Sequence, residues 1–151
     1  MADEKPTHLW KNITTTWDGG EGFVSENQYG AKMLIGKDKD GNIGIGPMDA
    51  LLAGLAGCTM YDILDILRKK RQEPVEFQVR VRGKQRLTEY PYQYIGFEVE
   101  YLLWGDNLTE KDVAQAVKLS EEKYCSVGGT LAKAGTIHST YRILKPGEAA
   151  D

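Results

Sequence analysis

The chain has 151 residues, of which 41% are hydrophobic and 27% are charged, and its net charge is −3. This composition is typical of a water-soluble domain large enough to form a core without disulfide bonds. The small negative charge argues against nucleic acid or an anionic membrane as a partner. We expect one domain over residues 8–145, with disordered ends at residues 1–7 and 146–151.

Apolar segments and the N-terminus give the expected location. The longest apolar run, residues 50–58, is far shorter than the ~20 residues that a membrane span needs. The first ten residues have no apolar core and so do not look like a signal peptide. We therefore expect no membrane contact and a cytoplasmic location.

The first third of the chain predicts short strands joined by tight turns. Residues 8–17 are rich in β-branched and aromatic side chains, and the Asp-Gly-Gly turn at 18–20 lets residues 22–26 return antiparallel. Residues 31–36 and 42–46 flank a second turn that contains an Asp-Gly pair. Two hairpins are therefore expected before the helix that begins at Pro47.

Pro47 suits the first position of a helix, which we expect to run to about Gln72 because Pro74 prevents its continuation. Residues 51–60 are apolar or small all round, a pattern that predicts complete burial. Charges appear from residue 62 onward, so the second half of the helix should emerge from the core.

Small residues form a stripe along this helix, here called the small-residue stripe: Ala50, Ala53, Gly54 and Gly57. Each glycine costs a helix interior about 1 kcal/mol relative to alanine, so close packing should compensate. The stripe could pack against the sheet of the same chain. Alternatively, the helix could cross its symmetry mate in a homodimer, where a self-complementary face is needed.

The second half of the chain predicts two adjacent antiparallel strands. Residues 75–82 alternate between apolar and polar side chains, and residues 95–103 do the same. The apolar side chains expected on one face of the second strand are Ile95, Phe97, Val99, Tyr101 and Leu103.

A second helix is expected to begin at Thr109, which forms a capping-box-like pattern with Asp112. Its expected buried stripe comprises Val113, Ala116, Val117, Ser120 and Tyr124. Gly128-Gly129 should interrupt or end the helix, and residues 136–144 read as a final strand. This order of elements predicts an α+β fold with antiparallel sheets.

Cys58 and Cys125 lie 67 positions apart and form no CxxC motif. Each could simply be a small buried apolar residue, although two buried helices could also bring them together. Burial in apolar surroundings raises a thiol pKa, so a reactive Cys58 would need a nearby cation. Both cysteines and His138 could supply three metal ligands, but no pair has zinc-type spacing, so neither metal nor cofactor is expected.

Two separated motifs carry a family resemblance. The segments GPMDALLAGLAGCTMYDIL and SEEKYCSVGGTL, in this order of elements, resemble the OsmC/Ohr family of thiol-dependent hydroperoxide reductases. The likeness covers roughly residues 8–144. It implies an intertwined homodimer with central helices packed together and a site at the subunit interface.

The resemblance also implies a mechanism. Cys58 matches the peroxidatic cysteine, whose thiolate attacks a peroxide to give a sulfenic acid. Cys125 matches the resolving cysteine, which then forms a disulfide that a dithiol reductant reduces. An apolar pocket lined by Leu51, Leu55 and Met60 would favour organic hydroperoxides.

The sequence departs from the family pattern at two activating positions. Peroxidase members use an arginine from the N-terminal strands, but the first arginine here is Arg68, so Lys32 or Lys37 would have to lend the charge. Met48 replaces the family glutamate, and Asp49 follows it as the candidate catalytic carboxylate. A non-catalytic dimer that binds a small apolar ligand is therefore the alternative function.

Overall fold

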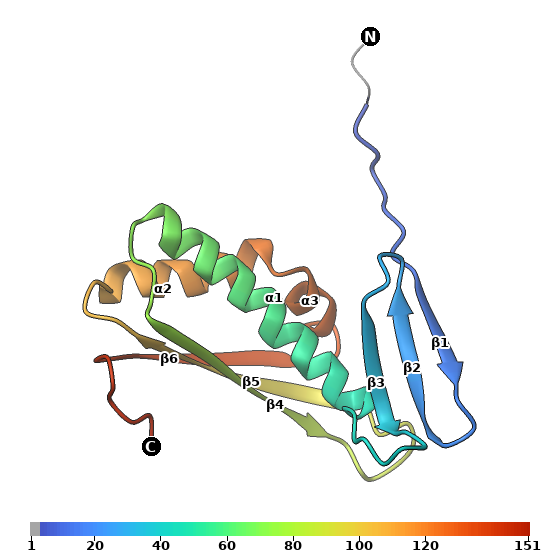
Figure 1. The fold of residues 1–151 in the computed structure, drawn as a ribbon. Coiled ribbons are helices and arrows are strands. Elements are labelled where there is room, and N and C mark those ends of the chain that lie inside the picture. The colour runs from blue at the N-terminus through green and yellow to red at the C-terminus, as the bar shows by residue number, and fades with distance from the viewer. Residues whose placement is uncertain (1–3) are drawn as a thin grey trace. The chain divides into compact units, whose positions relative to one another are not determined.

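The computed structural model describes residues 4–151, and its contacts divide into two compact units, residues 1–50 and 51–151. The fold is α+β, as predicted, with two three-stranded sheets in the described residues (Figure 1). A single domain over residues 8–145 stays a prediction. The elements are β1 (Ile13–Trp17), β2 (Glu21–Asn27), β3 (Lys32–Lys37), α1 (Pro47–Lys69), β4 (Glu76–Gln85), β5 (Tyr94–Trp104), α2 (Glu110–Leu119), the π-helical turn η1 (Ser120–Tyr124), α3 (Ser126–Leu131) and β6 (Thr136–Leu144).

The first unit contains the antiparallel sheet β1-β2-β3, which confirms the predicted hairpin between β1 and β2. At the first turn the Gly20 N–H donates to Asp18 Oδ1 at 2.9 Å, and Gly19 adopts φ +92°, a conformation that glycine accepts without strain. After β3 the Asn42 N–H donates to Asp38 Oδ1 at 2.8 Å and closes the second turn. β1 begins at Ile13, later than the sequence predicts.

Helix α1 begins at Pro47 as predicted but ends at Lys69, three residues earlier than expected. Arg71 adopts φ +58°, so the chain leaves the helix before Pro74 can stop it. The Lys69 Nζ donates to Asp65 Oδ2 at 2.7 Å across one turn of the exposed face. By length and apolar composition alone α1 could also cross a membrane, a test that core helices pass as well.

The prediction that the first half of α1 is buried all round is wrong for this chain. Its buried residues recur every four positions on one side only: Leu55, Thr59, Ile63 and Leu67. Leu51 is 44% exposed, and a Cβ at Gly57 would meet nothing within 4 Å. A Cβ at Gly54 would meet only Val127, at 3.8 Å. The chain's own sheet therefore does not pack against these two glycines of the small-residue stripe.

The second unit is built on the sheet β4-β5-β6. Strands β4 and β5 are antiparallel, as predicted, but β5 and β6 are parallel, so the expectation of purely antiparallel sheets is wrong. The reason is the connection between them, because α2, η1 and α3 form a crossover that returns the chain to the start of β5. Figure 1 shows these helices and α1 on one face of the sheet.

Strand β5 departs from simple alternation at its first residues. Gln85 pairs with Tyr94 and Lys84 pairs with Gly96, so Ile95 is an extra residue at a bulge. As a result Ile95 is 43% exposed and does not share the predicted apolar face, and Tyr94 is buried instead. The rest of the predicted face is buried, including Phe97, Val99, Tyr101 and Leu103.

The start of α2 is as predicted. Thr109 is the N-cap residue, and its Oγ1 accepts the Asp112 N–H at 3.3 Å. The Thr109 backbone N–H donates a hydrogen bond to Gln72 Oε1 at 3.0 Å. The second hydrogen bond of the cap is therefore made to the segment that follows α1. This contact ties the end of α1 to the start of α2.

The end of this helical segment differs from the prediction. Val113, Ala116, Val117 and Ser120 are buried, but Tyr124 is 48% exposed because η1 is a π-helical turn and breaks the 3.6-residue period. The helix ends at Cys125, where the backbone is extended. Gly128 and Gly129 lie inside the next helix, α3, and do not end the first.

The hydrogen-bonded Asp112 carboxylate should make the free energy of unfolding depend on pH. Hydrogen bonds from Lys70, Thr109 and Gln72 lower its pKa from 3.8 to about 2. Because the folded pKa is the lower one, this stabilisation is present above pH 3.8 and is lost as the pH falls toward 2. We expect Asp112→Asn to lower the urea midpoint at pH 7 and to have no such effect near pH 2. Asp106→Asn is the matched control at an exposed site, and equal midpoint losses for both variants would contradict the assignment.

The C-terminal tail, for which the sequence predicts disorder, contacts the sheet of the second unit. Trp104 Nε1 donates to the Glu148 carbonyl at 2.7 Å, and Arg142 donates to the Ala150 carbonyl at 2.7 Å. Asp151 also forms an ion pair with Arg80 at 2.7 Å. The tail therefore has defined partners at the end of the sheet.

Candidate active site

Helix α1 and the turn before α3 place two cysteines side by side. Cys58 lies in the middle of α1, and Cys125 lies between η1 and α3. Both are free thiols, and the two sulfur atoms and a carboxylate oxygen of Asp62 all lie within 4.8 Å of one another. The fold therefore brings together two cysteines that are 67 positions apart in the sequence, as the pairing hypothesis requires.

Cys125 is held by the first turn of α3. Its backbone is extended, at φ −72° and ψ 102°, and its Sγ accepts the Gly128 N–H at 3.2 Å. A Cβ at Gly128 would lie only 3.2 Å from that sulfur, so the absence of a side chain makes room for the thiol. This is a structural reason for a glycine three residues after the cysteine.

The two thiols have different surroundings. Cys125 is buried, whereas Cys58 is half-buried. Burial raises the pKa of the Cys125 thiol to about 12; the hydrogen bond with Cys58 and the charge of Asp62 act in the same direction, and the Gly128 N–H opposes them. Cys125 is therefore a neutral thiol at physiological pH, and Cys58 is the more accessible sulfur.

Asp62 is a site residue that the sequence interpretation missed. It was grouped with the charges expected to emerge from the core, but it lies one turn after Cys58 on the same side of α1. Its Oδ2 accepts a hydrogen bond from the buried Ser120 hydroxyl at 3.0 Å. The i, i+4 spacing of cysteine and aspartate was the available signal.

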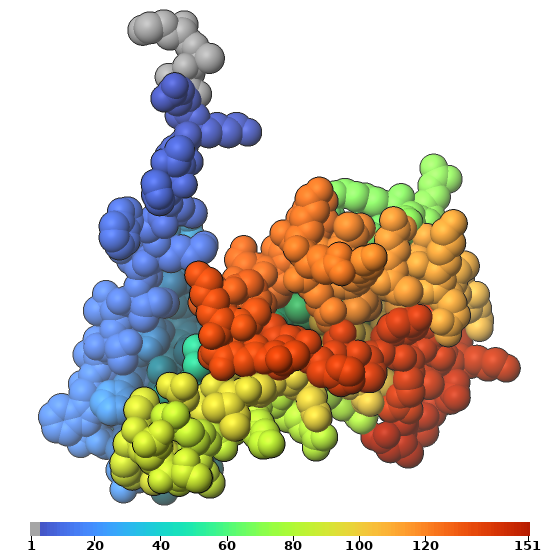
Figure 2. Space-filling view, turned by 180° about the vertical axis from the view of Figure 1, so that it is seen from behind, coloured from blue at the N-terminus to red at the C-terminus, as the bar shows by residue number. Residues whose placement is uncertain are grey.

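A cavity of about 320 Å³ adjoins Cys125. Leu55 and Thr59 of α1, Tyr101 of β5 and Gly128 of α3 contribute to its wall. The Tyr101 hydroxyl contacts Glu121 Oε1 at 3.4 Å, and burial raises the pKa of Tyr101 well above its usual range. Seen from behind, the orange helical segment that supplies Cys125 and Gly128 to this wall borders the redder residues that follow it in the chain (Figure 2).

Only one of the three predicted pocket residues lines the cavity in the described part of the chain. Leu55 lines the cavity, but Leu51, which is 44% exposed, and Met60 are absent from the described wall. Asp49 lies in the first turn of α1, nine residues before Cys58. At 1.5 Å and 100° per residue, that spacing is about 13 Å along the axis and half a turn around it. The catalytic role of Asp49 stays a prediction.

The two candidate lysines belong to the first unit, on β3. Lys32 Nζ lies 3.8 Å from Glu26 Oε2 in an exposed ion pair. Lys37, the last residue of β3, forms an isolated antiparallel backbone β-bridge with Ile43. Their proposed contribution to the thiolate at Cys58 stays a prediction.

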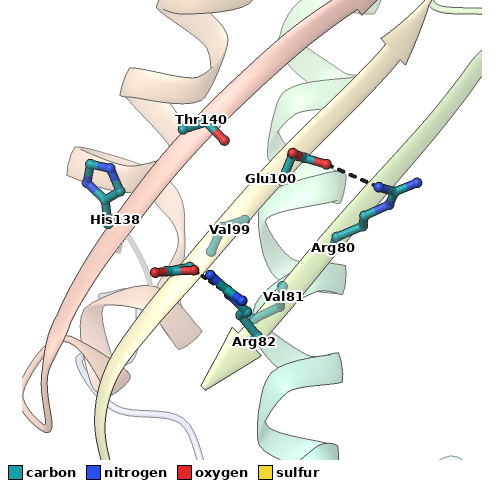
Figure 3. A pocket seen from close by; sticks show the side chains of 8 residues that line it. Arg80, Val81, Arg82, Val99, Glu100, His138 and Thr140 are labelled. Carbon is teal, nitrogen blue, oxygen red and sulfur yellow. Dashed lines mark hydrogen bonds and ion pairs between the residues drawn. The ribbon is translucent and has the colours of Figure 1, made fainter. Parts of the chain in front are cut away.

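His138 is not brought to the cysteines. It lines a shallow hollow of about 400 Å³ on the outer face of the sheet, whereas its neighbour Ile137 lines the cavity near Cys125. Successive residues of a strand point to opposite faces, so His138 cannot share a metal with both thiols. Figure 3 shows this outer face, where Arg80 pairs with Glu100 at 3.4 Å and Arg82 pairs with Glu98.

Two free thiols that lie together beside a mixed three-stranded sheet characterise this α+β fold. The OsmC-like protein family matches residues 36–140, and the chain belongs to this family. The resemblance seen in the sequence is thus confirmed, together with the OsmC-like fold.

Three relatives illustrate the range of similarity. The protein YhfA of Escherichia coli K12 is 34% identical over 131 residues, which are 85% of this chain and 94% of YhfA. The crystal structure of a hypothetical protein from Aquifex aeolicus matches with a TM-score of 0.79 and 30% identity, over 91% of this chain and 98% of that one. An organic hydroperoxide resistance protein OsmC from Legionella pneumophila shares the fold, with a TM-score of 0.65 and 14% identity, over 91% and 98% of the two chains.

Proposed function

We propose that the chain reduces organic hydroperoxides with Cys58 and Cys125. The observation that carries this proposal is the placement of two free sulfur atoms within 4.8 Å of each other, one of them beside an apolar cavity. Membership of the OsmC-like family and the similarity to an organic hydroperoxide resistance protein of Legionella pneumophila support it.

The exposure of the two thiols assigns their roles. The half-buried Cys58 thiol gives up its proton, and its thiolate attacks the terminal oxygen of the hydroperoxide. The O–O bond breaks, and the alkoxide takes up the released proton and leaves as the alcohol. Cys58 is then a sulfenic acid. The Cys125 sulfur attacks it, a disulfide forms, and the hydroxyl leaves with the Cys125 proton as water.

A dithiol reductant completes the cycle by exchange with the disulfide, and the cytoplasm supplies such reductants. Lys32 or Lys37 is the proposed cation for the Cys58 thiolate, because no arginine precedes Arg68. Asp49 is the proposed catalytic carboxylate, in place of the family glutamate. The apolar wall of the cavity is the proposed reason why an organic group is preferred over hydrogen peroxide.

Turnover tests this function. Purified chain should consume cumene hydroperoxide catalytically with dithiothreitol and only stoichiometrically without it. Hydrogen peroxide at the same concentration should be consumed at least about tenfold more slowly, because it gains nothing from the apolar wall. Consumption no faster than that of a mixture of free cysteine and dithiothreitol would contradict the proposal.

We also propose that the small-residue stripe pairs two chains in a homodimer. Ala53 and Gly54 are exposed, and open space surrounds Gly57. Gly57→Leu should convert the dimer to monomer in sedimentation, since a large side chain would separate the helices. Val75→Leu, at a 71% exposed position outside α1, is the control. A wild-type monomer, or a Gly57→Leu dimer of unchanged affinity, would contradict this pairing.

The alternative is a binding protein for a small apolar molecule, and the cavity of about 320 Å³ favours it. Native mass spectrometry of the purified chain should then reveal a bound apolar molecule that leaves on denaturation. A ligand that raises the thermal stability of the chain and is recovered chemically unchanged would favour binding over catalysis.

A further inference from the structure

We propose that the reduced chain binds a zinc ion through Cys58, Asp62 and Cys125. The three ligand atoms lie within 4.8 Å of one another and come from two separate parts of the second unit. This site does not include His138, because the fold places His138 on the other face of the sheet from the cysteines. It requires only the reduced thiols and stands whether or not Cys58 reacts with hydroperoxides.

The donor set suits zinc. Thiolate sulfur is a preferred ligand of Zn²⁺, and carboxylate oxygen is a common third donor. Two thiolates and one carboxylate also carry enough negative charge to offset the ion. Magnesium and calcium prefer sets made only of oxygen and would not select two sulfurs.

The geometry needs little adjustment. A tetrahedral zinc with Zn–S bonds of about 2.3 Å places its two sulfurs about 3.8 Å apart. The present separations of up to 4.8 Å can close through small side-chain rotations. Cys58 and Asp62 stand one turn apart on α1, so the helix backbone already holds two of the three ligands in a chelating arrangement.

Neighbouring groups hold the ligands in place. The Ser120 hydroxyl donates to Asp62 Oδ2 at 3.0 Å and restrains the orientation of the carboxylate. The Gly128 N–H donates to Cys125 Sγ at 3.2 Å and stabilises negative charge on that sulfur. Hydrogen bonds of this kind orient ligands in established metal sites.

Three protein ligands leave a fourth position open. Because Cys125 also lines the cavity, a water molecule or a small donor ligand could enter from that side. On binding, each thiol gives up its proton, and zinc itself is neither oxidised nor reduced. A disulfide between the cysteines would remove both sulfur donors, so the zinc form and the disulfide form exclude each other.

Cobalt provides a direct test, because Co²⁺ occupies zinc sites and absorbs light when bound by thiolate. We expect the untagged, reduced wild-type chain to bind one equivalent of Co²⁺ anaerobically, with a sulfur-to-cobalt charge-transfer band and the visible bands of a tetrahedral site. Added Zn²⁺ should displace the cobalt. Coordination by His8 or His138 would give no sulfur band.

Variants test the ligand set. Asp62→Asn should weaken Co²⁺ binding at least about tenfold, and Cys125→Ser should reduce the charge-transfer band by half or more. Asp65→Asn, at an exposed position one turn from the site, is the control and should bind as the wild type does. Circular dichroism verifies that each variant is folded.

Two results would overturn the inference: no charge-transfer band from folded, fully reduced wild type, or unchanged affinity in Asp62→Asn. The outcome is separate from that of the peroxidase assay. Cobalt binding without hydroperoxide turnover would leave the metal site standing and remove the proposed function, and turnover without cobalt binding would do the reverse.

Discussion

Cys58→Ser is expected to abolish hydroperoxide reduction, with a fall in turnover on the order of 10³-fold or more. Serine lacks the polarisable thiolate that attacks the peroxide oxygen, and no other described thiol is as accessible. Cys125→Ser should still react once with cumene hydroperoxide but should stop as a sulfenic acid on Cys58. Dimedone would trap that species, and mass spectrometry would place the adduct on the peptide that contains residue 58.

The two single variants act as controls for each other, because both remove one buried or half-buried sulfur. Absence of dimedone labelling from the folded Cys125→Ser variant would mean that Cys58 is not oxidised to a sulfenic acid. Labelling of Cys125 in the Cys58→Ser variant, at the rate seen in the Cys125→Ser variant, would reverse the assigned roles.

Leu67→Ala is expected to destabilise the chain by about 2–5 kcal/mol, because it leaves a cavity under α1. Leu67 is fully buried and ends the row of core residues that α1 turns toward the sheet. Urea denaturation monitored by circular dichroism measures the loss. Leu87→Ala, at a 70% exposed position, removes the same atoms and should change stability by about 0.5 kcal/mol or less.

A loss below about 1 kcal/mol for Leu67→Ala would contradict the burial of this row of side chains against the sheet. The comparison is informative because the charges in the second half of α1 predict that it emerges from the core, whereas Leu67 is fully buried. If the helix is buried on one side only, the apolar side chains on the other side belong to a different contact.

Periodicity predicted the elements well where a single face decides burial. The alternation over β4 and most of β5 was read correctly, and so was the N-cap at Thr109. The errors fall where the backbone departs from a regular period. A bulge moved Ile95 to the surface, and a π-helical turn did the same to Tyr124.

The parallel pairing of β6 was not predictable from strand patterns, because both directions bury the same residues. The segment between β5 and β6 was read as one helix that ended at Gly128-Gly129. The structure instead turns the chain at Cys125, which places the thiol at the beginning of α3. Only the folded crossover fixes the direction of the last strand.

The candidate site was partly accessible from sequence. The sequence predicts site roles for Cys58, Cys125 and Leu55, and these residues lie together. Asp62 was missed because a carboxylate near the exposed half of a helix usually faces water. Its partner Ser120 comes from 58 residues away, a contact that local pattern cannot reveal.

The pairing of the two sulfurs is tested most directly by a peptide map of the wild-type chain after one equivalent of cumene hydroperoxide. We expect both thiols to disappear and a disulfide to join the peptides that contain Cys58 and Cys125 within a single chain. Two free thiols in a folded, peroxide-treated protein would contradict it.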